Sequence, residues 1–241
     1  EYRSRVLPLS VAVCGRSWVA ERKRYCPEVD VMIAPAFRYS RVWRERSVTQ
    51  AAADFQVLIV LPLDVENTVD LLKSIVELAG RPEMEGLAFL LKPHPALSMD
   101  SLLARSCFSL PSSLTVVEGD FFEYLEQASV IIGSASSTLL EAVACGIPVI
   151  VAGSLTGVSH NPIPEAVPQD IWRLCYKVEE MAEALEQFRS MTDADRKRLA
   201  AIGRDIRAAY FEPATREAVR SFLRLSGNQD AAKDKIHEKR I

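Results

Sequence analysis

A lysine and a histidine stand among prolines directly after an apolar run, in the segment LLKPHP at residues 90–95. Each proline fixes its own φ angle and pushes the residue before it toward an extended backbone, so Lys92 and His94 are both held stiffly. A neutral imidazole donates to a phosphate oxygen or a sugar hydroxyl, and an imidazolium offsets negative charge. A structural histidine at a rigid turn is the alternative, but the adjacent lysine and the position at a strand end favour ligand binding.

Small hydroxyl residues form a second candidate site, in the segment GSASST at 133–138, between an apolar run at 130–132 and a helical pattern. Its hydroxyl residues are Ser134, Ser136, Ser137 and Thr138. Unpaired N–H groups at the start of a helix favour a phosphate, and the hydroxyls add further donors. One serine could serve only as the helix N-cap, but four hydroxyl groups exceed the need of one cap, so both roles can coexist.

Glu141 follows in the same helical pattern, four residues after Ser137 and three after Thr138. Residues at these spacings share a helix face, so the three side chains are expected on one side. A carboxylate there accepts hydrogen bonds from the vicinal hydroxyls of a ribose beside the phosphate. Alternatively, Glu141 only complements the positive end of the helix.

Apolar runs alternating with helical patterns must position these residues. The expected strands are Val11–Val13, Val31–Ala34, Val57–Leu61, Leu87–Leu91, Leu114–Val117, Val130–Ile132, Pro148–Val151 and Leu174–Val178. The expected helices are Ser17–Tyr25, Val65–Leu78, Ser98–Ser106, Phe121–Gln127, Ser137–Ala144, Glu179–Arg189, Asp193–Tyr210 and a last one opened by Pro213 and ending at Leu225. This rhythm predicts an α/β fold, a doubly wound parallel sheet with a helical C-terminus. Parallel strands end at one edge, so His94 and residues 136–138 are expected to face a common cleft and hold one phosphate.

The pattern divides the chain into four parts. Residues 1–37 are interpreted as the tail end of a preceding domain, because the basic and aromatic stretch after them fits neither a strand nor an amphipathic helix. Residues 38–55 are then the connector, 56–225 a complete α/β domain, and 226–241 a polar, disordered tail. The opening Glu1-Tyr2-Arg3 has no methionine and no apolar signal core, which indicates a cut in a longer protein.

Composition excludes several classes of protein. Twenty-nine basic and thirty-two acidic side chains leave a net charge of −3, without the basic excess of a nucleic-acid binder. The sequence has no run of about 18 apolar residues, no GxGxxG, no phosphate-binding P-loop motif and no GxSxG. The five cysteines are widely spaced without a CxxC pair, so buried free thiols in a reducing compartment, by default the cytoplasm, are expected.

Together, KPHP at 92–95 and GSASSTLLEAVACGIPVIV at 133–151 resemble the C-terminal domain of GT-B glycosyltransferases. The resemblance is nearest to bacterial surface-polysaccharide enzymes of sialyltransferase-like, Kdo-transferase-like and glycerophosphotransferase-like branches. APAFRY at 34–39 is similar to the end of the N-terminal domain in a group of surface carbohydrate biosynthesis proteins. It implies that His94 is the histidine of a histidine-proline motif and that residues 136–138 are the serine motif, both of which hold the nucleotide's phosphate. Glu141 then matches the acidic residue that contacts the ribose.

The resemblance also implies a function: transfer of a sugar from a nucleotide-activated donor, with a CMP-linked sugar as one candidate, to a capsule, lipopolysaccharide or O-antigen acceptor. No metal or cofactor is expected, and the location implied is the cytoplasm with peripheral contact to the inner membrane. The acceptor site and usually the catalytic base lie in the N-terminal domain of such enzymes, so no catalytic residue is assigned and this chain alone is expected to be inactive. A nucleotide-sugar 2-epimerase of the same fold and a non-catalytic module in polysaccharide assembly are the alternatives.

Overall fold

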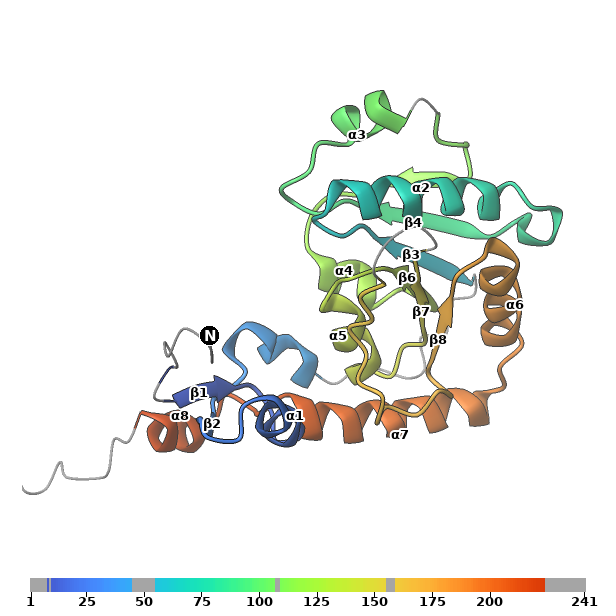
Figure 1. The fold of residues 1–241 in the computed structure, drawn as a ribbon. Coiled ribbons are helices and arrows are strands. Elements are labelled where there is room, and N and C mark those ends of the chain that lie inside the picture. Colours follow the sequence, from blue (N-terminus) through green and yellow to red (C-terminus); the bar gives the residue numbers. More distant parts are fainter. Residues whose placement is uncertain (1–7, 9, 45–54, 107–108, 155–158, 224–241) are drawn as a thin grey trace, which may run out of the picture. The chain divides into compact units, whose positions relative to one another are not determined.

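A computed structural model describes residues 8, 10–44, 55–106, 109–154 and 159–223. The chain forms two compact units (Figure 1). The first unit combines Glu1–Arg44 with Arg207–Ile241, and the second consists of Glu45–Ile206. The candidate site residues all lie in the second unit.

The second unit is built on a six-stranded sheet in the order β5-β4-β3-β6-β7-β8, in which every neighbouring pair is parallel. The strands are β3 Gln56–Val60, β4 Ala88–Lys92, β5 Leu114–Val116, β6 Val130–Gly133, β7 Val149–Ala152 and β8 Trp172–Cys175. The helices between and after them are α2 Val65–Ala79, α3 Met99–Ser106, α4 Phe121–Leu125, α5 Thr138–Ala144, α6 Val178–Arg189 and α7 Asp193–Tyr210, with a short 3-10 helix, η2, at Pro82–Met84. The predicted doubly wound α/β fold is confirmed.

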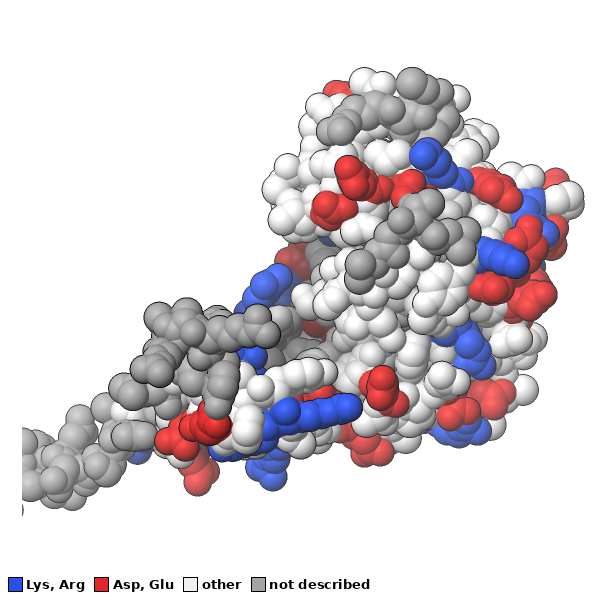
Figure 2. Space-filling model, in the orientation of Figure 1, with Lys and Arg blue, Asp and Glu red and all other residues white. Residues whose placement is uncertain are grey.

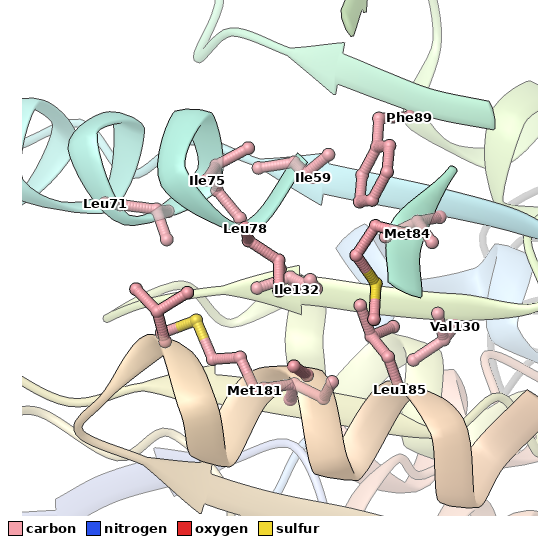
Figure 3. Close-up of a cluster of buried hydrophobic side chains, with 14 of the residues drawn as sticks. Ile59, Leu71, Ile75, Leu78, Met84, Phe89, Val130, Ile132, Met181 and Leu185 are labelled. Carbon is pink, nitrogen blue, oxygen red and sulfur yellow. The ribbon is translucent and has the colours of Figure 1, made fainter. Parts of the chain in front are cut away.

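Helices cover both faces of this sheet, as expected for strands that are almost continuously apolar (Figure 1). Ile59 and Ile132 project from the sheet into a buried cluster with side chains of α2 and α6, among them Leu78 and Leu185 (Figure 3). The intervening residues point to the other face, where Val60 and the α5 residue Leu139 both lie against Gly133. The central strands are therefore packed on both faces, and this packing holds the carboxyl ends of the strands in place.

The end of α5 and the middle of α7 approach each other through two glycines. Gly146 adopts φ +77°, the left-handed conformation that favours glycine just past the end of a helix. A Cβ at Gly203 in α7 would lie 2.5 Å from the Gly146 nitrogen. Backbone therefore packs directly on backbone here, which holds the middle of α7 against the end of α5.

The first unit begins with a β-α-β piece: β1 Ser10–Val13, α1 Ser17–Tyr25 and β2 Asp30–Ile33, whose two strands pair in parallel. The chain returns to it at Arg207, in the last turn of α7. Glu212 donates its N–H to the Cys14 carbonyl over 2.6 Å and accepts from Ala36 N over 2.8 Å. A Cβ at Gly15 would lie 2.2 Å from the Tyr210 backbone, so only glycine admits this contact.

This grouping differs from the predicted division at its C-terminal part. Residues from Arg207 on, including α8 (Arg216–Phe222), group with the first unit rather than with residues 56–206. In the part of the chain that the structure describes, β1 and β2 pair only with each other. The predicted connector begins with a 3-10 helix, η1 (Phe37–Trp43), and most of its remainder lies outside the described residues, as does the predicted tail at 226–241. The origin of residues 1–37 in a preceding domain stays a prediction.

Two element boundaries were predicted wrongly. The last strand ends at Cys175, not at Val178, which instead begins α6. The final helix begins at Arg216 with Thr215 as its N-cap, so Pro213 does not open it. The other predicted elements lie within one or two residues of the observed ones.

Four cysteines are described, and all four are free thiols, as predicted. Only Cys175 is buried; Cys14, Cys26 and Cys145 are half-buried, so the expected burial holds for one of them. Cys107 lies outside the described residues.

The surface mixes both signs of charge. On the face shown in Figure 2, Lys and Arg side chains alternate with Asp and Glu. Arg81, for example, pairs with Glu83 over 2.6 Å and with Glu179 over 3.1 Å. Within the described ranges, no helix has the length and apolarity needed to cross a membrane.

Candidate nucleotide-binding site

A cavity of about 420 Å³ opens at the carboxyl ends of β4 and β5. Its walls come from the turn after β4 and from the residues that follow β5. The lining includes Lys92, His94, Ser98, Val117, Glu118 and Gly119. The first motif found in the sequence thus forms one wall of a concave site at the sheet edge where open α/β folds bind ligands.

Lys92 is the last residue of β4 and is only 8% exposed. Its ammonium lies 6.0 Å from the centre of the Tyr124 ring, and the Tyr124 hydroxyl donates to the Glu118 carbonyl over 2.6 Å. Lys92 forms no ion pair with any described residue. Because Lys92 lines the cavity, its ammonium is available to pair with an anionic ligand bound there.

His94 lies two residues further on, half-buried in the turn that the prolines stiffen. Its Nδ1 accepts a hydrogen bond from the Ala96 N–H over 3.2 Å, and its carbonyl accepts from Leu97 N over 2.9 Å. A neutral imidazole whose Nδ1 accepts carries its proton on Nε2, so this hydrogen bond assigns the tautomer. His94 therefore offers an Nε2–H donor in the cavity wall.

The serine loop, residues 134–137, joins β6 to α5 in a strained conformation. Ala135 has φ +46°, a left-handed value that a non-glycine residue rarely adopts outside functional or tightly constrained sites. The hydroxyls of Ser136 and Thr138 are hydrogen-bonded to each other over 2.7 Å, and Thr138 N donates to Ser136 Oγ over 3.4 Å. Ser136 therefore supplies a local cap, while the Ser137 side chain makes no capping hydrogen bond.

Two further predicted site residues are buried, one in this loop and one in α5. The Ser134 hydroxyl is covered and has no hydrogen-bond partner among the described residues. Glu141 is 5% exposed in α5. Because α5 has only seven residues, its dipole is small, and the loop's own donors matter more for an anion than the dipole invoked from the sequence. The contact of Glu141 with a ribose stays a prediction.

Strand register places the two motifs at the same level of the sheet. Val60 of β3 pairs with Lys92 on one side and with Gly133 on the other. Two strand spacings, about 9.6 Å, therefore separate Lys92 from Gly133. The motifs share one edge, as predicted, but their strands β4 and β6 are not neighbours, because β3 lies between them. That His94 and the serine loop bind one phosphate together stays a prediction.

Sequence reasoning undervalued the residues after β5 and β8. Asp120 is the N-cap of α4 and accepts from Phe122 N over 2.8 Å, and Gly119 before it lines the cavity. Tyr176 was placed inside a strand, although it follows β8 and is 41% exposed. For Gly119 a signal was present, since it stands two residues past the apolar run that ends at Val117. Tyr176 lies inside the run 174–178, so the sequence did not mark it as a strand-end residue.

No protein-family model and no curated protein matches the sequence. Among solved structures, the glycotransferase of kitacinnamycin aligns over 90% of this chain and 54% of its own, with 17% identity and a TM-score of 0.56. The calicheamicin glycosyltransferase CalG4 aligns over 86% and 55%, with 15% identity and a TM-score of 0.56. The UDP-GlcNAc 2-epimerase of Methanocaldococcus jannaschii, solved with UDP-GlcNAc and UDP, aligns over 82% and 59%, with 15% identity and a TM-score of 0.54.

These likenesses establish the fold. The chain has the Rossmann-like α/β architecture of the GT-B type, and it spans little more than half the length of each of these structures. At such low identity the likeness extends to the path of the chain and not to individual site residues.

Proposed function

We propose that this chain is the donor-binding part of a glycosyltransferase that takes a sugar from a nucleotide-activated donor. One observation carries the proposal: Lys92, which forms no ion pair with a described residue, and the His94 Nε2–H donor share a cavity at the carboxyl edge of the sheet. The serine loop begins at the same level, on the other side of β3. The fold shared with two glycosyltransferases and a nucleotide-sugar epimerase supports the same conclusion.

In this proposal the cavity holds the nucleoside, and Lys92 and His94 bind the phosphate that leaves with it. Transfer breaks the bond between the anomeric carbon and the phosphate oxygen and forms a bond from that carbon to an acceptor oxygen. Fixed positive charge and a hydrogen-bond donor stabilise the negative charge that develops on the leaving phosphate. In the proposed site, Lys92 and His94 thus stabilise the charge of the leaving phosphate without a metal ion. Ser134, Ser136, Ser137 and Thr138 add donors, and Glu141 accepts from the ribose.

The finer assignments rest on the motif resemblance. They are a surface-polysaccharide or lipopolysaccharide acceptor, a donor that includes CMP-linked sugars among its candidates, and a cytoplasmic site of action with peripheral membrane contact. The acceptor and the catalytic base are assigned to the remainder of the enzyme. This division of labour predicts that the chain alone binds donor but does not transfer sugar.

A binding screen tests the proposal first. Thermal shift and calorimetry with CMP, UDP, GDP, ADP and dTDP are expected to identify one base that stabilises the chain at micromolar to millimolar concentration. Failure of every nucleotide to bind would refute it.

The alternative, a 2-epimerase, predicts that the full-length parent consumes the nucleotide sugar without an acceptor glycan, whereas a glycosyltransferase requires one. A non-catalytic module predicts turnover under neither condition.

A further inference from the structure

Tyr176 is an exposed aromatic side chain in a fixed position at the ligand-binding edge of the sheet. It is 41% exposed and follows β8 directly. Its N–H donates to Glu180 Oε2 over 2.6 Å, and Lys177 N donates to the same oxygen over 3.3 Å. The carboxylate of Glu180 therefore holds the backbone on which the ring stands.

A glycine provides the space in which the ring lies. Gly153 follows β7 and donates its N–H to the Cys175 carbonyl over 2.8 Å. A Cβ at Gly153 would lie 2.5 Å from Tyr176 Cε1 and 2.6 Å from Cδ1, closer than any real contact. One side of the ring thus rests against bare backbone, and any side chain at residue 153 would displace it.

The order of the strands indicates which part of a bound nucleotide sugar would lie beside the Tyr176 ring. The cavity lies at β4 and β5, the serine loop follows β6, and β7 and β8 continue the sheet on the far side of that loop. Two strand spacings, about 9.6 Å, separate β8 from β6. A nucleotide sugar with its nucleoside in the cavity and its phosphate between His94 and the serine loop extends its sugar toward β7 and β8.

We propose that Tyr176 stacks against the transferred sugar of the donor, in a subsite whose shape depends on Gly153. The inference rests on the proposed function, because it assumes a nucleotide sugar in the site. A pyranose ring presents C–H groups on one face, and a rigid aromatic ring buries such a face at little cost in conformational entropy. The ligand class is therefore a donor that carries a pyranose, and Tyr176 is a positioning residue for it.

Calorimetry on the full chain tests this with two ligands, the nucleotide that binds best and its sugar derivative. Tyr176→Ala is expected to weaken binding of the nucleotide sugar by about threefold to tenfold, the range for one aromatic contact, while affinity for the nucleotide stays within about twofold. Tyr176→Phe keeps the ring and is expected to bind both ligands like the unaltered chain. Gly153→Ala, which displaces the ring, is expected to reproduce the Tyr176→Ala result.

Tyr25→Ala is the matched control, since Tyr25 is 72% exposed in the first unit and belongs to neither motif. The inference is overturned if Tyr176→Ala binds the nucleotide sugar as tightly as the unaltered chain does. It is also overturned if affinity for nucleotide and nucleotide sugar falls equally, because the ring would then contact the nucleoside. If the unaltered chain binds no nucleotide, the proposed function itself fails, and this assignment falls with it.

Discussion

The two nitrogens of His94 have separate tasks in the proposed site, and substitution can separate them. Nδ1 accepts from Ala96 N within the turn, whereas Nε2 carries the proton that would reach a phosphate. An asparagine at this position places its amide oxygen close to where Nδ1 stands and has no group at the Nε2 position. A glutamine places an N–H donor nearer to Nε2. We therefore expect His94→Asn to keep the turn and lose the phosphate contact, and His94→Gln to keep part of that contact.

The size of the effect follows from the type of hydrogen bond. A donor to a charged phosphate contributes about 1.5–3 kcal/mol, so His94→Asn is expected to raise the Kd for the nucleotide about 10-fold to 150-fold. The bond to Ala96 is a neutral one at the surface, and its loss in His94→Ala costs about 0.5–1.5 kcal/mol of folding free energy at most. The asparagine variant is expected to unfold at the same denaturant concentration as the unaltered chain, because it retains that acceptor.

Isothermal titration calorimetry and urea denaturation on the same samples measure both quantities. Lys73→Ala serves as a control, because Lys73 is an exposed cation on α2 that pairs with Asp70 over 3.6 Å and does not line the cavity. Its loss is expected to leave nucleotide affinity unchanged. An asparagine variant that binds nucleotide as tightly as the unaltered chain would show that the Nε2 proton does not contact the ligand, and the assignment of His94 would be wrong.

Three predictions concern stability. Gly203→Ala is expected to lower the free energy of unfolding, measured in urea, by about 1–3 kcal/mol, because its Cβ would lie 2.5 Å from the Gly146 nitrogen. An unchanged free energy of unfolding would show that α7 can shift to make room for the methyl group. Thr192 Oγ1 caps α7, since it donates to the Asp195 carboxylate over 2.6 Å and accepts from Asp195 N over 3.2 Å. Thr192→Ala is therefore expected to lower the free energy of unfolding by about 1 kcal/mol, and Thr192→Ser, which keeps the hydroxyl, by much less. Burial raises the pKa of Cys175 from 9.0 to about 11, so the unfolded chain loses this proton first and stability falls as the pH rises from 9 to 11. The urea midpoint is expected to drop less over that range in Cys175→Ser, and an equal drop would assign the effect to other groups.

The sequence predicted the elements well because each carries its own local signal. The continuous apolar runs of the central strands can only be buried between two layers of helices, and they appear where the pattern put them. Helix α7 was predicted to the residue, because its polar start provides the capping pair of Thr192 and Asp195. The motif residues were found by the same logic, since unusual polar side chains directly after apolar runs must lie at the sheet edge.

The errors arose where a specific hydrogen-bond partner, near or far in the sequence, decides where an element begins or ends. The run Leu174–Val178 favours a strand throughout, but Glu180 takes the N–H groups of Tyr176 and Lys177 and ends the strand at Cys175. Pro213 is a suitable first residue of a helix, yet its neighbour Glu212 is paired with Cys14 and Ala36 in the first unit. Cys14 and Ala36 lie 198 and 176 positions from Glu212, and Glu180 reaches back four and three positions to Tyr176 and Lys177. Neither propensity nor periodicity contains these partners.

Strand order is a similar case, and it determines what the site can hold. The chain makes β3, β4 and β5 in turn on one side and then crosses back to add β6, β7 and β8 on the other side of β3. The loops after β4 and β6 therefore flank the central strand, at the point where the direction of winding reverses and where open α/β sheets bind ligands. Because Lys92 and Gly133 are both in register with Val60, the loops after β4 and β6 begin at the same height on the sheet edge. A ligand that contacts both must cross β3 along the sheet edge, which suits an extended molecule with a phosphate at its middle better than a compact one.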